Sequence, residues 1–322
     1  MQLSHLRWLT LPLLAVAAPS WADQPLSDLF TQGKPILDAR YRFENVDQNN
    51  DLRDANAQTL RTRAGFQSGQ WHGLSGLLDV DNVSRIGDDA YNSTRNGQKE
   101  YAVVADPDGT EVNQALLRYD HKLGSAVLGR QRINLDNQRF IGSVAWRQNE
   151  QTFDGALTQL KPLDGLTLSY AYLDQVNTVF GPDNGRYDNL TNPANIDGHS
   201  HLINAQYVFM PQLTATAYSY LLDLDNIAVA PTAAEGTLSS QTSGLRLNGV
   251  VAGVSYALEY ARQKDYGDNP LELDSEYYLA ELGYTLKGVQ LKAGYEVLGG
   301  DNGSGNRAFQ TPLATKHAFQ GW

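Results

Sequence analysis

The chain has 322 residues, of which 41% are apolar and 19% charged, and its formal net charge is −11. It contains no cysteine, which excludes a disulfide framework, a catalytic thiolate, a thiolate metal site and the lipid-modified cysteine of a bacterial lipoprotein. The acidic balance argues against a nucleic-acid partner, because proteins of that class carry basic surfaces.

The amino terminus, residues 1–22, has the pattern of a secretory signal peptide. Arg7 precedes an apolar run from Trp8 to Pro19, which is too short to cross a bilayer as a helix. Ser20-Trp21-Ala22 is a small-x-small cleavage site, so we expect the mature chain to begin at Asp23. The alternative is an uncleaved anchor. After this segment, no stretch approaches the roughly 18 apolar residues of a membrane helix.

From Ile36 onward, apolar and polar residues alternate with the period of two that is typical of β-strands. Between Val254 and Ala261, for example, Val, Tyr, Leu and Tyr alternate with Ser, Ala, Glu and Ala. Counting such segments gives about 13 strands, with ends good to a few residues. They lie near residues 36–46, 57–67, 74–83, 112–119, 125–133, 152–160, 166–176, 201–209, 213–224, 241–248, 254–264, 274–286 and 289–298.

A soluble β-sandwich would show the same alternation, but three features favour a membrane barrel. Many strands have about 9 to 12 residues, the length of a tilted transmembrane strand. Tyr and Phe recur near strand ends, as in aromatic girdles. Short connections, such as 210–212 and 287–288, alternate with long ones, such as 84–111 and 177–200. Residues 23–322 therefore predict an all-β, antiparallel, up-and-down transmembrane β-barrel of the outer membrane.

The odd strand number has a consequence, because a bacterial single-chain barrel has an even number of strands and leaves no edge open in lipid. The end of the chain, Lys316–Trp322, lacks the alternation of a final strand. We therefore expect a chain truncated at its carboxyl end, from a barrel of about 18 strands. A miscount of one strand is the alternative.

Polar side chains that face the lumen form the functional surface of a barrel. In the first five strands these inward positions are rich in arginine, which outnumbers the carboxylates. The predicted pore-lining residues are Arg40, Arg42, Arg61, Arg63, Arg118, Arg130, Arg132, Asp79 and Asp81. Since guanidinium groups bind carboxylate or phosphate in pairs of hydrogen bonds, an anionic permeant is expected. The alternative is a set of Arg–carboxylate ladders that only hold the wall together.

The long connection 134–151 mixes apolar and aromatic residues with its polar ones, which is unusual for an exposed loop. Folding into the lumen would bury Phe140 and Ile141. We therefore predict a constriction loop that carries Arg139, Trp146 and Arg147. The alternative is a loop that only packs on the rim.

Two segments of the chain carry a family resemblance. They are GRQRINLDNQRFIGSVAWRQNEQTFDGA (Gly129–Ala156) and AGYEVLGGDNG…AFQTPLATKHAFQGW (Ala293–Trp322). Both resemble the bacterial alginate-export outer-membrane family, and the resemblance extends over essentially the whole mature chain. It implies a monomeric, wide barrel of about 18 strands with an electropositive lumen suited to a polyuronate. It also implies pore or constriction roles for Arg130, Arg132, Arg139 and Arg147. In that family the chain continues beyond the positions that match Phe319–Trp322.

The function that we expect is an outer-membrane channel for anionic solutes, and the more specific expectation is an exporter of an alginate-type polyuronate. The alternatives are a surface receptor or adhesin, and an outer-membrane enzyme that acts through its external loops. The histidines do not group with nucleophiles, and the pair His199 and His201 lacks a third metal ligand. We therefore expect no catalytic residue, no metal and no cofactor. The expected partners are outer-membrane lipid, lipopolysaccharide and an anionic solute or polysaccharide.

Overall fold

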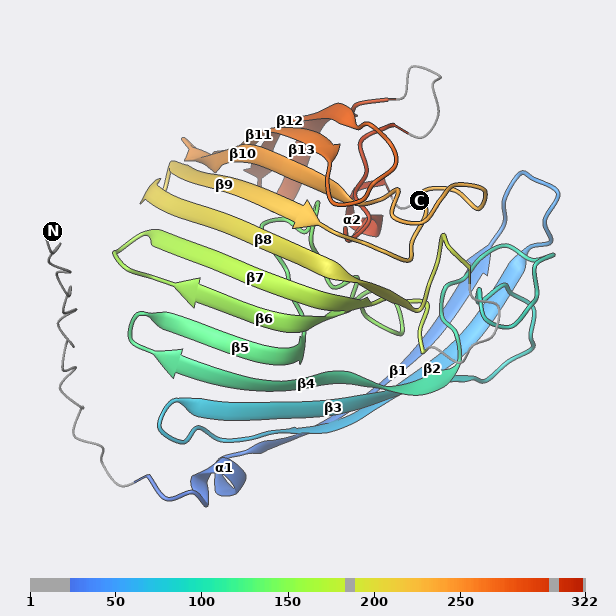
Figure 1. Cartoon of the computed structure of the whole chain (residues 1–322), viewed down its shortest axis with the longest axis horizontal. Helices are drawn as coiled ribbons and strands as arrows, with labels where there is room; N and C mark the ends of the chain where they lie inside the picture. The colour runs from blue at the N-terminus through green and yellow to red at the C-terminus, as the bar shows by residue number, and fades with distance from the viewer. Residues whose placement is uncertain (1–23, 183–188, 301–306, 321–322) are drawn as a thin grey trace, which may run out of the picture.

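The structure, a computed structural model, describes residues 24–182, 189–300 and 307–320. It contains 13 strands in one antiparallel sheet, in which each strand pairs with its neighbours in sequence (Figure 1). The strands are β1 (Lys34–Val46), β2 (Ala55–Gln67), β3 (Leu74–Arg85), β4 (Gly109–His121), β5 (Gly124–Gln131), β6 (Thr152–Leu160), β7 (Leu166–Asn177), β8 (Asn195–Met210), β9 (Leu213–Leu222), β10 (Ser240–Val251), β11 (Val254–Asp265), β12 (Asp274–Leu286) and β13 (Val289–Leu298). The predicted strand number and class are thereby confirmed. The predicted signal peptide, residues 1–22, lies outside the described residues.

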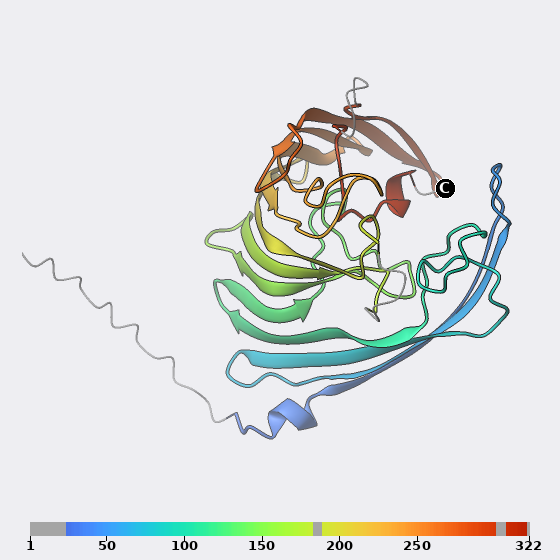
Figure 2. The ribbon, with the colours of Figure 1, turned by 45° about the vertical axis from the view of Figure 1, so that its right-hand side comes forward.

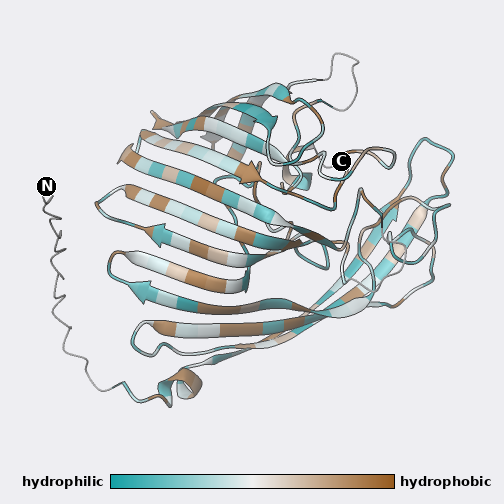
Figure 3. Ribbon diagram, in the orientation of Figure 1, coloured by the Kyte–Doolittle hydropathy of each residue, from teal (hydrophilic) through white to brown (hydrophobic). Residues whose placement is uncertain are grey.

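Hydrophilic and hydrophobic residues alternate along the strands (Figure 3). The exposed fractions assign the apolar side chains to the outer, convex face of the sheet and the polar or small ones to the inner, concave face. In β11, Leu258 and Tyr260 are 48% and 43% exposed, whereas Glu259 and Ala261, which alternate with them, are 6% and 0% exposed. A soluble protein would instead bury the apolar face and expose the polar one. Because apolar surface left in water costs roughly 25 cal/mol per Å², this outer face requires an apolar surrounding such as lipid.

The connections differ in length at the two ends of the sheet. At one end, strands are joined by tight turns such as that between β12 and β13, and at the other by long loops such as that between β3 and β4. Aromatic side chains form a belt beside the short turns. Its members are Phe66, Tyr119, Phe209 and Tyr284, which are 37%, 44%, 56% and 44% exposed. Such a belt is typical of the interface between the hydrocarbon and the aqueous phase.

One strand begins earlier than the sequence predicted. β8 starts at Asn195 rather than near residue 201, and pairs with β7 across a register shift between Leu173 and Gln175. The extension includes Gly198, whose φ is +147° and whose added Cβ would lie 1.9 Å from the carbonyl oxygen of Asp223. This polar, glycine-containing start lacks the apolar alternation by which strands are recognised.

The sheet curves into an open wall, with β1 and β13 at its two edges (Figure 2). The helices have four residues each, α1 (Asp28–Thr31) before β1 and α2 (His317–Gln320) after β13. Among the described residues, no helix is long and apolar enough to cross a membrane. The segment that follows β13 and the long connection between β5 and β6 both enter the curve, and there they form the candidate site.

Candidate permeation pathway

Residues 132–151 leave the end of β5, cross the concave side of the sheet and return to β6. Their apolar residues pack on one wall. The Phe140 ring contacts those of Tyr218, Tyr277 and Phe309 at centroid distances of 5.5, 5.3 and 5.9 Å. Phe140 and Ile141 are only 8% and 1% exposed. This is the inward fold that the sequence predicts, and burial of these side chains is its driving force.

The segment after β13 packs against residues 132–151. The backbone N–H of Gly142 donates to the Leu313 carbonyl at 2.9 Å. An added Cβ at Gly142 would lie 2.4 Å from Thr315 Oγ1, so a larger residue would separate the two segments. Farther along, the rings of Trp146 and His317 stack at 4.0 Å. The two segments therefore form one internal layer within the curved wall.

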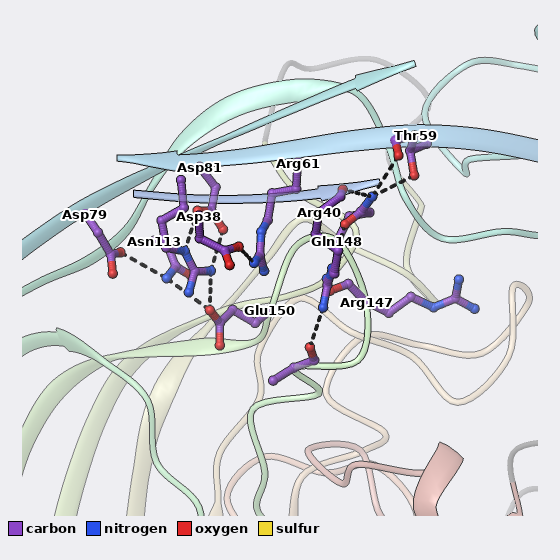
Figure 4. Close-up of polar contacts among 12 residues, drawn as sticks. Asp38, Arg40, Thr59, Arg61, Asp79, Asp81, Asn113, Arg147, Gln148 and Glu150 are labelled. Carbon is purple, nitrogen blue, oxygen red and sulfur yellow. Dashed lines mark hydrogen bonds and ion pairs between the residues drawn. The ribbon is translucent and has the colours of Figure 1, made fainter. Parts of the chain in front are cut away.

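The opposite side of the internal layer is polar and faces β1–β4 (Figure 4). Glu150 is 5% exposed and accepts from Arg132 Nε at 2.5 Å, and it also pairs with Arg63. Arg63 in turn binds Asp81 through two hydrogen bonds of 2.6 Å. Glu150 therefore connects the internal layer to β2 through a charged and buried network, in which each hydrogen bond is stronger than a neutral one.

Gln148 makes a second attachment, on β1 and β2. Its Oε1 accepts from Arg40 Nε at 2.9 Å, and its Nε2 donates to the Thr59 carbonyl at 3.1 Å (Figure 4). Arg40 Nη1 also donates to the Ala145 carbonyl at 3.1 Å. Within the described part of the chain, Arg40 has amide and carbonyl partners but no carboxylate partner.

A third attachment surrounds Asp106, a fully buried residue of the loop between β3 and β4. Its Oδ1 accepts from the backbone N–H of Gln148 at 3.0 Å, and its Oδ2 lies 3.4 Å from Arg42 Nε and 3.8 Å from Arg147 Nη1. Arg147 also donates to Glu44 at 3.1 Å. Arg42 and Arg147 lie 4.9 and 4.1 Å from the centre of the Trp146 ring, in cation–π contact.

The predicted inward residues Arg61, Asp79 and Asp81 are buried in the wall itself. Arg61 pairs with Asp38 on β1. Asp79 accepts from the backbone N–H of Gln114 at 2.9 Å and from the side chain of Asn113 at 3.0 Å, where β4 makes a register shift. These contacts correspond to the wall-holding ladders that the sequence left as an alternative.

Two predicted arginines do not lie where the sequence placed them. Arg139 is 1% exposed, because Glu296 binds its Nε at 2.6 Å and the Tyr277 and Phe319 rings cover it at 5.6 and 4.9 Å. It therefore attaches the internal layer to β13 instead of lining an opening.

Arg130 extends from the same face of β5 as Leu128, which is 63% exposed on the convex side. It binds Asp154 on β6 through two hydrogen bonds of 2.8 Å. The prediction that Arg130 faces the lumen was wrong. Its neighbour Gln131, which is only 2% exposed, is the residue that faces inward.

Most of the inward arginines that the sequence predicted have a carboxylate partner. On the polar side of the internal layer, Arg40, Arg42, Arg61, Arg63, Arg132 and Arg147 lie among Asp38, Glu44, Asp79, Asp81, Asp106 and Glu150. Two of these carboxylates, Asp106 and Glu150, come from loops and were not part of the strand-based prediction. For Glu150, the sequence did offer a signal, namely the polar run from Arg147 to Gln151 inside a segment that also carries apolar residues.

Residues 36–317 match the sequence profile of the family described as Alginate export. The chain belongs to the alginate-export family. A comparison with curated protein sequences gave no match.

This member of the alginate-export family is similar in fold to solved outer-membrane β-barrel porins. Acinetobacter baumannii OccAB4 is 16% identical, with a TM-score of 0.62, over 82% of this chain and 66% of that one. Pseudomonas aeruginosa OccK3 (OpdO) is 20% identical, with a TM-score of 0.60, over 84% and 64%. Pseudomonas aeruginosa OpdL is 19% identical, with a TM-score of 0.58, over 90% and 73%. The chain thus spans about two thirds of the length of the first two of these relatives.

In this alginate-export family member, the curved wall has a polar pocket of about 340 Å³ beneath the internal layer, toward the end with the short turns. Glutamines from four strands line it, together with Arg118 of β4 and Arg132. Both arginines keep contact with solvent, since their side chains are 43% and 36% exposed. Arg118 binds Asp120 of its own strand at 2.6 Å, and Arg132 binds Glu150. These guanidinium groups are accessible to a solute within the curve.

Two loop carboxylates of the internal layer have shifted pKa values. Burial raises the pKa of Asp106 above its ordinary value of 3.8, although Arg147 and the Gln148 N–H oppose the shift. Burial would also raise that of Glu150, but the hydrogen bond from Arg132 and the charge of Arg63 hold the Glu150 pKa below 4.5. Glu150 is therefore ionised when the layer is attached, whereas Asp106 takes up a proton more readily than an exposed aspartate.

Proposed function

We propose that this chain forms the wall of an outer-membrane channel for anionic solutes, and that an alginate-type polyuronate is one cargo. The observation that carries the proposal is the polar pocket beneath the internal layer, where Arg118 and Arg132 are accessible to water. A channel of this kind works without chemistry. The wall excludes lipid, the internal layer narrows the passage, and guanidinium groups raise the local concentration of anions.

The family and the fold support this reading. The alginate-export profile covers residues 36–317, and the exposed apolar face of the sheet suits a membrane. The matched inner charges limit the anion preference, because most arginines already have carboxylate partners. We therefore expect modest selectivity, determined by the most exposed arginines.

The cellular setting completes the proposal. Residues 1–22 direct export and are removed, the barrel lies in the outer membrane against lipid and lipopolysaccharide, and the protein acts as a monomer. Neither a cofactor nor a nucleic acid takes part.

The test is the reversal potential across a planar bilayer in a KCl gradient. Replacing Arg118 and Arg132 together by Gln should move the reversal potential toward the value for a non-selective pore. Arg262→Gln is the matched control, because Arg262 is an exposed arginine of β11 that binds Asp274 at 2.6 Å on the convex face. An unchanged reversal potential in the double variant would contradict the anionic part of the proposal. A folded, inserted protein without conductance would contradict the channel itself.

A further inference from the structure

A second pocket, of about 340 Å³, lies at the end of the sheet that carries the long loops. The loops that follow β3, β5, β7 and β9 contribute to it, as does the segment after β13. Its volume is at the low end of the range for small-molecule sites, about 300–1,000 Å³. The polar pocket beneath the internal layer shares no lining residue with it.

The walls of this outer pocket are mostly apolar. The aliphatic side chains that line it include Val103, Val144, Val179, Ile196, Ile227 and Leu238. Four of them, Val179, Ile196, Ile227 and Leu238, are less than 10% exposed, so the walls are packed from behind. Aliphatic walls cannot replace the hydrogen bonds that a sugar hydroxyl loses on leaving water, which costs about 1–3 kcal/mol for each unpaired group. The pocket therefore fits an apolar body better than a sugar.

The charged residues at this pocket are cations only. Arg147 and Lys316 line it, and among its described lining residues none is acidic. Arg147 is already paired with Glu44 and Asp106. Lys316 is an exposed residue, and within the described part of the chain its ammonium group makes no hydrogen bond and no ion pair. One cation at the pocket is thus left without a counter-charge, and it suits a ligand with a single anionic group.

Trp146 borders the same pocket. Its indole Nε1–H is buried and has no acceptor among the described residues, although a tryptophan N–H in the interior usually has one. Because Trp146 and Lys316 line the same pocket, an acceptor on a ligand bound there would supply the partner that this N–H lacks.

We propose that the outer pocket binds an amphiphilic monocarboxylate, an apolar ring or short chain bearing one carboxylate. The carboxylate pairs with Lys316 and the apolar body contacts the aliphatic walls. This inference rests on the proposed function, because it gives the channel a solute-binding site at the long-loop end, and it adds a ligand class that differs from a polyuronate.

Binding is tested on the full-length chain in lipid nanodiscs by titration calorimetry, without an applied voltage. The probe is cyclohexanecarboxylate, compared with its neutral analogue cyclohexanecarboxamide and with glucuronate, a polar anion of similar charge. The wild type should bind cyclohexanecarboxylate at least tenfold more tightly than either comparison compound.

Two variants separate the contributions of charge and shape. Lys316→Gln should weaken the binding of cyclohexanecarboxylate about tenfold and leave the carboxamide unchanged, while Lys161→Gln in the β6–β7 turn is the matched control. Val103→Trp fills the pocket from a residue that is 46% exposed, so it should abolish binding without threatening the fold. Equal binding of glucuronate, or undiminished binding in both variants, would overturn the inference.

A parallel bilayer recording distinguishes the two proposals. Conductance without binding of cyclohexanecarboxylate would overturn this inference and leave the proposed function standing. Binding without conductance would overturn the proposed function, although the pocket would retain its ligand class.

Discussion

Glu150 shows how one carboxylate holds a large internal segment. It is 5% exposed and is shared by Arg63, a wall residue, and Arg132, the first residue of the internal layer after β5. A buried carboxylate is stable only when its partners satisfy it, and here two guanidinium groups do so. The sequence predicted both arginines as pore-lining residues but gave no reason to single out Glu150, since its pairing with Arg63 joins positions 87 residues apart.

The attachment through Glu150 should depend on pH. Because the pKa of Glu150 is lowered in the folded state, its stabilising contribution is fully present above 4.5 and is lost as the pH falls through the lowered value. Hydrogen-exchange protection of residues 134–151, corrected for intrinsic rates, should stay constant from neutral pH to about 5 and then decrease.

Glu150→Gln should already weaken the attachment at neutral pH, by about 2 kcal/mol, because charged hydrogen bonds are replaced by neutral ones. Its protection should change less on acidification than that of the wild type. Glu235→Gln, at an exposed loop position without a partner among the described residues, is the control. Wild-type protection in Glu150→Gln would mean that the network does not hold the segment.

At the scale of elements, the segment 132–151 is a two-faced layer. Its apolar residues pack on β9, β12 and the segment after β13, and its polar residues bind β1 and β2. The sequence predicted the inward fold from Phe140 and Ile141 alone, because exposed loops seldom carry such residues. It did not predict which wall each face meets, since that depends on the curvature of the whole sheet.

Phe140→Ala should detach the apolar face. Loss of a buried aromatic side chain costs about 3–5 kcal/mol in a rigid core, and the Phe140 ring contacts four other aromatic rings. We expect faster proteolysis within residues 134–151 while the strands remain resistant. The control is Phe43→Ala. The Phe43 side chain is 57% exposed on the outer face of β1, so its loss should leave this cleavage rate unchanged. Equal cleavage of Phe140→Ala and wild type would show that the ring cluster is not required.

At the scale of the molecule, the period of two was enough to predict the strand number, the two faces and the alternation of short and long connections. These properties are local, because each strand carries its own apolar stripe. The charge balance of the interior was not predictable in this way. It depends on loop residues such as Asp106, and on strand residues such as Arg130, which lies on the outer face because its neighbour Gln131 occupies the inward position.

The assignment of one face to lipid and the other to the interior leads to a direct prediction for two adjacent residues of β4. Leu117 is 65% exposed on the convex face, whereas Leu116 lines the polar pocket. Leu117→Arg should destabilise the folded barrel by about 2–4 kcal/mol in lipid, as expected for a cation on the lipid-facing surface. Leu116→Arg should cost much less. Urea unfolding in lipid bilayers compares the two variants, and a larger cost for Leu116→Arg would reverse the assignment of the faces.

The central claim is that the wall lines a conducting passage that the internal layer narrows. It is tested most directly by single-channel recording of Ala145→Cys, since Ala145 is an exposed residue of that layer beside Arg40 and the chain has no other cysteine. Modification by a charged methanethiosulfonate reagent should reduce the current stepwise in Ala145→Cys and leave the cysteine-free wild type unaffected. A current that does not change after complete modification of Ala145→Cys would contradict the claim.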